Sequence, residues 1–304
     1  MRGDGAGGPR RAPATRRLFP PLFGALVAAQ VGYARLPERR RVAATRGIVV
    51  LMLATSVAEA PPARRPLIGL AGAVGFAAEL VGVATGRPFG HYTYTDRLGP
   101  RIGGVPVLAA AAWAMMARPS WAVAGRLTRH RTARVAAAAG ALAAWDVFLD
   151  PRMVREGYWT WPGGGRYEGV PASNFAGWLA TGAAVFAAWS LVEKARPAAL
   201  PAVVASAAVP SAAVVPDGVP PDGVPPAAAP PNAAAPPAAA APPAAAPALP
   251  DDGGALALYV WTWLAETFAN GVLWRRPRVA LAGSVAMGAF AVPALRRARS
   301  ATPA

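Results

Sequence analysis

Eight apolar segments limit the folds that are open to this chain. Most of them approach the roughly 20 residues that a helix needs to cross about 30 Å of hydrocarbon. The segments run over 18–34, 47–60, 67–85, 102–117, 132–150, 174–193, 255–273 and 279–295. The second and fourth are short, and residues 119–125 either extend the fourth segment or lie in the membrane interface. We predict an all-α, polytopic integral membrane bundle with about eight transmembrane helices.

The composition supports a membrane protein and argues against other classes. Hydrophobic residues make up 54% of the 304 residues and charged residues make up 15%, which is too few charges to cover a soluble enzyme. The net charge of +16 comes mostly from arginines that lie between the apolar segments, where anionic headgroups attract them. We therefore expect membrane lipid rather than nucleic acid as a partner, and a multi-pass protein of the cell membrane.

Shifts in composition divide the chain into four parts. Residues 1–17 are a Gly-, Pro- and Arg-rich tail, which we predict to be disordered. Residues 18–195 contain the first six apolar segments. Residues 196–254 are almost entirely Ala, Pro and Val, and because repeated prolines break helices we predict a flexible, disordered linker. Residues 255–304 contain the last two segments, which we predict to form a two-helix membrane block.

Four carboxyl groups lie within the predicted membrane helices, where an ionisable group costs at least roughly 2.5 kcal/mol and is a functional candidate by default. They are Glu79, Asp146, Asp150 and Glu266. Glu79 shares one helix face with a stripe of glycines at alternating spacings of three and four residues. The stripe consists of Gly72, Gly75, Gly82 and Gly86. Such a stripe lets helices approach closely, so Glu79 should point into the bundle, either for catalysis or for packing alone.

Asp146 and Asp150 lie four residues apart, near the end of one apolar segment. They therefore share a helix face, and two like charges that close favour a shared proton. We expect Pro151 to end this helix directly after Asp150. The alternative is that Asp150 only faces solvent at the helix mouth.

Glu266 belongs to a second stripe, this time of aromatic and polar side chains. The stripe consists of Tyr259, Trp263, Glu266, Asn270 and Trp274. On an otherwise apolar helix this pattern indicates a lined cavity, although Trp and Tyr near helix ends also serve as interfacial residues.

Two long loops, 85–101 and 151–173, are rich in glycine and aromatic residues. They join the third helix to the fourth and the fifth to the sixth, so by parity they lie on the same side of the membrane. The ends of the helices that carry Glu79 and Asp146 should therefore converge beneath both loops, as in a lidded pocket.

Motifs for metals and cofactors are not evident. The chain contains no cysteine, and its two histidines, His91 and His130, lie in loops on opposite predicted faces, which argues against a zinc site. No glycine-rich segment fits a nucleotide-binding turn. A prenyltransferase is disfavoured because the chain has one Asp-x-x-x-Asp pair without a second cluster for Mg²⁺. We predict no metal and no cofactor.

The motifs of the central region form a linked pattern. Its first half is Glu79, Thr85-Gly86-Arg87-Pro88-Phe89-Gly90-x-Tyr92-x-Tyr94, Leu98-Gly99 and Gly104-Val105-Pro106. Its second half is Trp145-Asp146-x-x-x-Asp150-Pro151, Gly157-x-Trp159-x-Trp161, Tyr167-x-Gly169-Val170-Pro171 and Asn174-Phe175-x-Gly177-Trp178. Together they resemble the carotenoid biosynthesis membrane proteins, a family that includes the CruF-type carotenoid hydratases and the bisanhydrobacterioruberin hydratases.

The resemblance implies addition of water to the terminal C=C bond of an acyclic carotenoid, without a redox cofactor. A buried carboxyl group favours its protonated form, and aromatic faces stabilise a carbocation by roughly 0.5 to 2 kcal/mol each. We predict Glu79 or Asp146 as the proton donor and Asp150 as the group that orients water and accepts its proton. The predicted substrate-binding residues are Phe89, Tyr92, Tyr94, Trp145, Trp159, Trp161, Asn174 and Trp178.

Two other functions remain open on the sequence. A non-catalytic carrier for isoprenoids, or an assembly partner for other carotenoid-pathway membrane enzymes, would use the small-residue stripes for packing. A carotenoid cyclase would use the same protonation step but capture the cation with a neighbouring alkene. Water access separates the cyclase from the hydratase, and the polar loops favour hydration.

Overall fold

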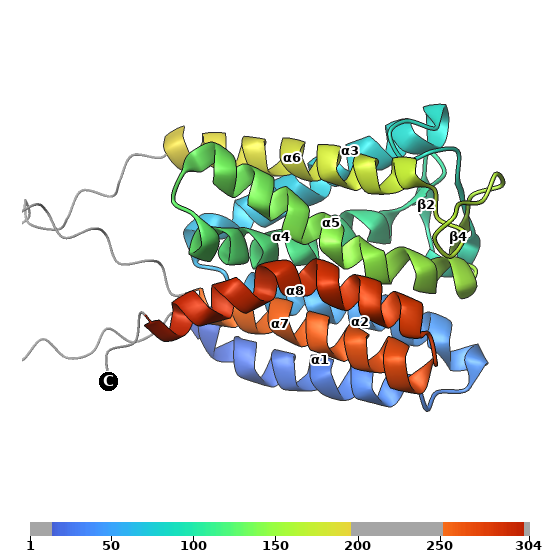
Figure 1. Ribbon diagram of the computed structural model, residues 1–304, viewed down its shortest axis with the longest axis horizontal. Helices are drawn as coiled ribbons and strands as arrows, with labels where there is room; N and C mark the ends of the chain where they lie inside the picture. The colour runs from blue at the N-terminus through green and yellow to red at the C-terminus, as the bar shows by residue number, and fades with distance from the viewer. Residues whose placement is uncertain (1–13, 196–251, 301–304) are drawn as a thin grey trace, which may run out of the picture. The chain divides into compact units, whose positions relative to one another are not determined.

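Eight α-helices lie side by side in the part of the chain that the computed structural model describes, residues 14–195 and 252–300 (Figure 1). They are α1 (Phe19–Tyr33), α2 (Glu38–Glu59), α3 (Arg65–Thr85), α4 (Val107–Leu127), α5 (Arg131–Arg155), α6 (Ala172–Ala195), α7 (Gly253–Phe268) and α8 (Pro277–Ser300). Four short strands lie in the loops: β1 (Thr93–Tyr94), β2 (Arg101–Ile102), β3 (Val105–Pro106) and β4 (Trp159–Thr160). The prediction of an all-α bundle is confirmed.

Two of the predicted parts fall mainly outside the described residues. Residues 1–13 of the predicted tail lie outside them, and Ala14–Leu18 form a short 3-10 helix. Residues 196–251 of the predicted linker also lie outside them. The last two helices, α7 and α8, pack against α4 and α5, so they belong to the same compact unit as the first six.

Six of the described helical segments are long and apolar enough to cross a membrane. They are α2, α3 with its preceding turn, α4, α5, α6 and α8. The count of about eight was therefore approximate, because α1 and α7 have 15 and 16 residues. The chain is a polytopic helical membrane protein.

The fourth helix is longer than the hydropathy of its sequence indicates. Its apolar run ends before Arg118, yet α4 continues to Leu127 and includes residues 119–125. Arg118 is fully buried, and its Nη2 atom lies 3.3 Å from Glu59 Oε1 and 2.6 Å from Asp252 Oδ1. A buried charge is tolerated when it is paired in this way, so two carboxylates from distant parts of the chain allow the helix to continue.

The expected end of the fifth helix at Pro151 was wrong, because α5 continues to Arg155. Proline has no N–H to donate to the carbonyl of Val147, four residues earlier. The hydroxyl of Tyr167, in the following loop, donates to this carbonyl oxygen at 3.0 Å. Burial raises the pKa of Tyr167 to about 12, so the hydroxyl keeps its proton. Proline inside a membrane helix is tolerated where such a partner satisfies the freed carbonyl.

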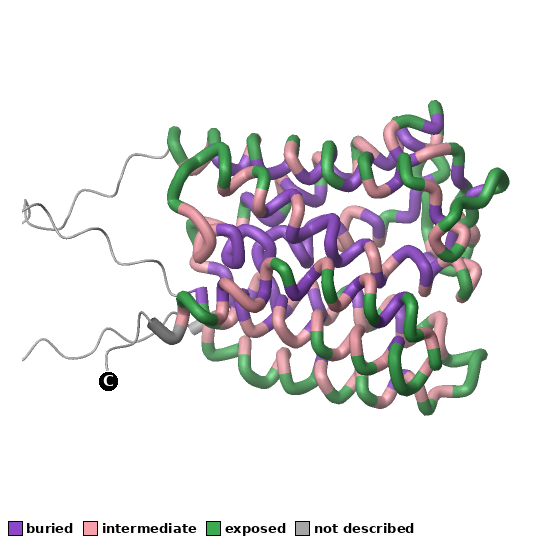
Figure 2. The backbone as a smooth tube through the Cα atoms, viewed as in Figure 1, coloured by how far each residue is buried: buried purple, intermediate pink, exposed green. Residues whose placement is uncertain are grey.

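Burial is concentrated along α4 and α5, in the centre of the bundle (Figure 2). The glycine stripe of α3 faces this centre, as predicted. A Cβ atom on Gly75 would lie 2.1 Å from the Trp113 ring, and one on Gly82 would lie 2.7 Å from Phe89. Because only glycine allows these approaches, the stripe directs Glu79 into the bundle, where its side chain is buried.

Candidate functional site

The two long loops meet at one end of the bundle, as parity predicted. Strand β1 from the first loop pairs antiparallel with β4 from the second, and Tyr94 lies opposite Trp159. Directly paired residues in a sheet place their side chains together on one face; the Tyr94 and Trp159 rings are 5.5 Å apart. The short sheet therefore fixes both loops above the ends of α3 and α5.

Three neutral donors surround the carboxyl group of Glu79. Trp113 Nε1, from α4, donates to Oε1 at 3.0 Å. Tyr94 Oη donates to Oε2 at 3.0 Å, and Tyr92 Oη makes a short hydrogen bond to the same oxygen. These three hydrogen bonds are the polar contacts of the Glu79 carboxyl group, and no arginine, lysine or histidine of the described residues forms an ion pair with it.

The two tyrosines are firmly held as donors. Burial, and then the charge of Glu79, raise the pKa of Tyr92 and of Tyr94 well above the usual range of a phenol. A phenol beside a carboxylate resists ionisation because its phenolate would be a second negative charge. Both hydroxyls therefore donate to Glu79 throughout the physiological pH range.

Asp146 and Asp150 form a buried pair that is bridged by one amide. Asn174 Nδ2, at the start of α6, donates to Asp146 Oδ2 at 2.8 Å and makes a short hydrogen bond to Asp150 Oδ2. Trp159 Nε1 donates to Asp150 Oδ1 at 3.1 Å. Asp146 and Asp150 are only 0% and 2% exposed, so the alternative in which Asp150 faces solvent at the helix mouth does not hold.

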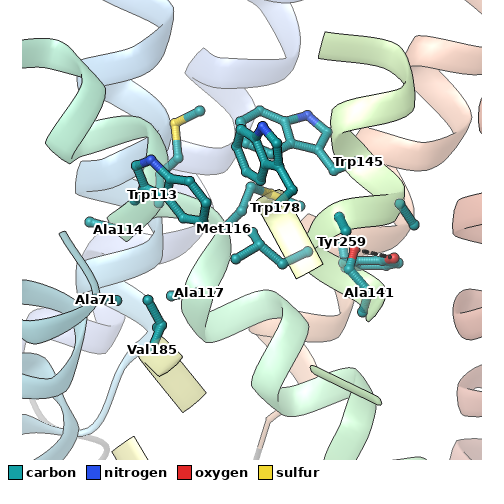
Figure 3. Packing of buried hydrophobic residues seen from close by; sticks show 14 of the residues in the cluster. Ala71, Trp113, Ala114, Met116, Ala117, Ala141, Trp145, Trp178, Val185 and Tyr259 are labelled. Carbon is teal, nitrogen blue, oxygen red and sulfur yellow. Dashed lines mark hydrogen bonds between the residues drawn. The ribbon is translucent and has the colours of Figure 1, made fainter. Parts of the chain in front are cut away.

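Tryptophan rings build the wall between these carboxyl groups. The rings of Trp113 and Trp178 stack, with centroids 4.1 Å apart, and Trp145 meets Trp178 edge-on at 6.0 Å (Figure 3). Nearer the loops, the Tyr92 ring lies 5.7 Å from Trp161, whose Nε1 donates to the backbone oxygen of Phe89. The site therefore presents π faces on several sides, the geometry that attracts a cation.

A small cavity of about 50 Å³ lies at the centre of these groups. It brings together two of the predicted catalytic residues and seven of the predicted substrate-binding residues. They are Glu79, Asp150, Phe89, Tyr92, Tyr94, Trp159, Trp161, Asn174 and Trp178. Asp146 and Trp145 lie behind this lining: Asp146 contacts it through Asn174, and Trp145 through Trp178. The cavity has room for a few water molecules.

Trp113 is a hydrogen-bonding residue of this site that the sequence analysis missed, and apolar lining residues such as Val49 and Met153 were missed as well. Trp113 hydrogen bonds to Glu79 and stacks on Trp178. A signal was present, because tryptophan in membrane helices prefers the interface and Trp113 lies inside an apolar segment. A buried indole N–H needs an acceptor, and the carboxyl groups predicted within the membrane helices were candidates for it.

Glu266 lies outside this cavity. Its Oε1 atom is 3.5 Å from Arg152 Nη1, and it lines a different cavity together with Trp274. Tyr259 and Trp263 of the same stripe instead donate to backbone carbonyls of α5 and α8. Among the described residues, no group of three or more His, Cys, Asp or Glu side chains is arranged to hold a metal ion.

The fold and the site define a class: a polytopic helical membrane protein with buried carboxyl groups beneath two aromatic loops. Residues 23–215 match the family model described as carotenoid biosynthesis protein, and the chain belongs to this family. The resemblance seen in its motifs is thereby confirmed.

One relative with an assigned activity has also been found. The bisanhydrobacterioruberin hydratase of Haloarcula japonica is 34% identical over 109 residues, which make up 34% of this chain and 37% of that protein. The chain thus matches well under half of this relative's length. No solved structure matches the chain.

Proposed function

We propose that this protein hydrates the terminal C=C bond of an acyclic carotenoid and produces a tertiary alcohol. Membership of the carotenoid biosynthesis family and the hydratase relative support this proposal. The observation that carries it is the Asp146–Asp150 pair, whose hydrogen-bond partners Asn174 and Trp159 are neutral donors. A buried acid of this kind, next to aromatic walls and a water-sized cavity, matches what alkene hydration requires.

The proton comes from Asp150, which lines the cavity, with Asp146 behind it. Two ionised carboxylates this close together would repel each other, so the pair holds one shared proton. Transfer of this proton to the less substituted alkene carbon forms the new C–H bond from the π electrons. A tertiary carbocation remains on the neighbouring carbon, and the aspartate pair becomes fully ionised.

The rings and Glu79 then stabilise the cation until water adds. The faces of Trp178, Trp161 and Tyr92 are available to the positive charge. Glu79, held as a carboxylate by its three donors, supplies a fixed negative charge at the same cavity. The oxygen of a cavity water bonds to the cationic carbon, and the proton that this water loses returns to the aspartate pair, which regenerates the acid. The sequence assigned the donor to Glu79 or Asp146; the hydrogen bonds favour the pair.

The test is expression in a host that makes the acyclic carotenoid lycopene, with pigments analysed by mass. We expect pigments heavier by one or two water molecules, and none of these in cells that carry the Asp146→Asn, Asp150→Asn double variant. Unchanged lycopene bound to the purified protein would instead indicate a carrier. A product with the mass of lycopene but with its absorption shifted to shorter wavelength, as ring formation at the end of the chain would cause, would indicate a cyclase.

A further inference from the structure

A second cavity, of about 720 Å³, lies between α1, α2, α5 and α7. It shares two walls with the smaller one. On α2, Ile48 lines the large cavity and Val49 lines the small one; on α5, the corresponding neighbours are Arg152 and Met153. Neighbouring residues of the same two helices therefore line the two spaces, which lie on adjacent faces of α2 and of α5.

The large cavity is bordered by apolar side chains that are also exposed on the outside of the bundle. Val31, Leu264, Phe268 and Leu273 are 49%, 51%, 57% and 46% exposed. These residues belong to α1, to α7 and to the π-helical turn that follows α7 (Ala269–Leu273); α1 and α7 lie next to each other at one side of the bundle (Figure 1). In a membrane protein, exposed apolar side chains of this kind are suited to contact the hydrocarbon of the bilayer.

Arg35 lines this cavity as an exposed cation and donates to the backbone oxygen of Val31 at 3.5 Å, whereas the less exposed polar groups are paired with other side chains. Arg152 pairs with Glu266 at 3.5 Å, and its guanidinium lies 4.5 Å from the centre of the Tyr33 ring. Gln30 Oε1 accepts a hydrogen bond of 2.6 Å from Trp261 Nε1. The inner lining therefore carries no net charge from these groups, and it suits an uncharged chain better than a charged headgroup.

The sizes of the two cavities set a requirement for any isoprenoid substrate. About 50 Å³ accommodates a few waters, which is too little for the branched end of a carotenoid. About 720 Å³ is in the range of small-molecule sites. Met153, which lines the small cavity next to Arg152 of the large one, is unbranched and therefore suited to change rotamer.

We propose that the large cavity is the entry site of the substrate: it takes the apolar polyene chain from the bilayer and directs its end past Val49 and Met153 into the small cavity. This inference rests on the proposed function, because it names the route to the same site. The occupant is an uncharged acyclic carotenoid, and the large cavity contributes binding rather than chemistry.

The experiment fills the large cavity and measures bound pigment separately from chemistry. Leu264→Trp and Ala265→Trp place an indole in it, and Leu281→Trp and Val285→Trp, at positions 69% and 65% exposed on α8, are matched controls. Each protein is purified from cells that make lycopene. We expect the two cavity variants to retain about tenfold less pigment per protein and to yield correspondingly less hydrated product, and the α8 variants to equal the wild type.

The readouts separate the two proposals. Asp150→Asn should lose hydration and keep its pigment, because it changes the acid and not the entry site. Wild-type protein that binds lycopene but never hydrates it would overturn the proposed function and leave the entry site intact. Cavity variants that retain full pigment would overturn the entry site, as would a co-purified phospholipid that these variants lose while pigment stays constant. Should Ala265→Trp fail to insert, Leu264→Trp carries the same test at an exposed position.

Discussion

Buried carboxyl groups occur at both ends of the bundle, but their partners differ. At the loop end, Glu79 and Asp150 are held by neutral donors from tyrosine, tryptophan and asparagine. At the opposite end, Glu59 and Asp252 are paired with Arg118. A cation stabilises the ionised form of a buried carboxyl group, whereas a second carboxyl group close by, as in the Asp146–Asp150 pair, favours a shared proton that can be transferred. Under the proposed mechanism, this difference separates the structural carboxyl groups that pair with Arg118 from the carboxyl groups that act on the substrate.

The largest effect is expected from Asp150, the proposed proton donor. Asp150→Asn keeps the shape of the side chain and removes the transferable proton, so hydration should fall by about 10²- to 10⁴-fold. The measurement is the ratio of hydrated to unhydrated carotenoid in cells with equal amounts of inserted protein. Asp252→Asn, at the other end, is the matched control and should lower stability without a comparable loss of chemistry per folded molecule. Equal losses in both variants would abolish the distinction.

The next largest effect is expected on stability, from replacement of Arg118 at the end of the bundle opposite the loops. Arg118→Met removes the fully buried cation and leaves Glu59 and Asp252 with only the more exposed Arg16 and Arg64, at 3.9 and 3.5 Å, at a cost of up to about 3–5 kcal/mol. We expect a large drop in the thermal midpoint of the detergent-solubilised protein. Adding Glu59→Gln and Asp252→Asn to this variant should restore much of the loss, because the uncompensated charges are then gone. A single variant as stable as the wild type would show that the cluster is not structural.

A smaller effect is expected at Glu79, which assists the cation and does not donate the proton. Glu79→Gln removes the negative charge and should reduce hydration by about 10²-fold, the lower range for a lost electrostatic group. Glu266→Gln serves as the cation-paired comparison, since Glu266 contacts Arg152, and should change hydration less. The rates of both variants are measured in the same lycopene-producing cells. A greater loss at Glu266 would place the active site in the other cavity.

The smallest effect is expected from loss of the Tyr167 hydroxyl, which donates to the carbonyl oxygen of Val147 that Pro151 leaves without a partner in α5. Tyr167→Phe keeps the ring beside Phe175 and removes the donor to Val147. A buried carbonyl without its partner costs about 1–3 kcal/mol, which should appear as a modest drop in the thermal midpoint. Hydration should fall slightly, because Asp146 and Asp150 lie in the same turns. An unchanged midpoint would mean that another donor serves this carbonyl.

Helical periodicity and the number of helices were enough to predict two main features of the site from the sequence. The spacing of Gly72, Gly75 and Gly82 placed Glu79 on an inward face, and the number of apolar segments placed both aromatic loops at one end. Both inferences depend on the geometry of a single helix or on the order of helices along the chain. Neither requires knowledge of which side chains touch across the bundle.

Contacts between distant segments had to be read from the tertiary structure. Arg118 ended an apolar run in the sequence but lies inside a helix, because Glu59 and Asp252 pair with it from 59 and 134 residues away. The separation of Asp150, in the lining, from Asp146, behind it, depends on the position of Asn174 on another helix. A sequence determines such features only through the packed fold, since the free energy of a buried charge depends on which partners surround it.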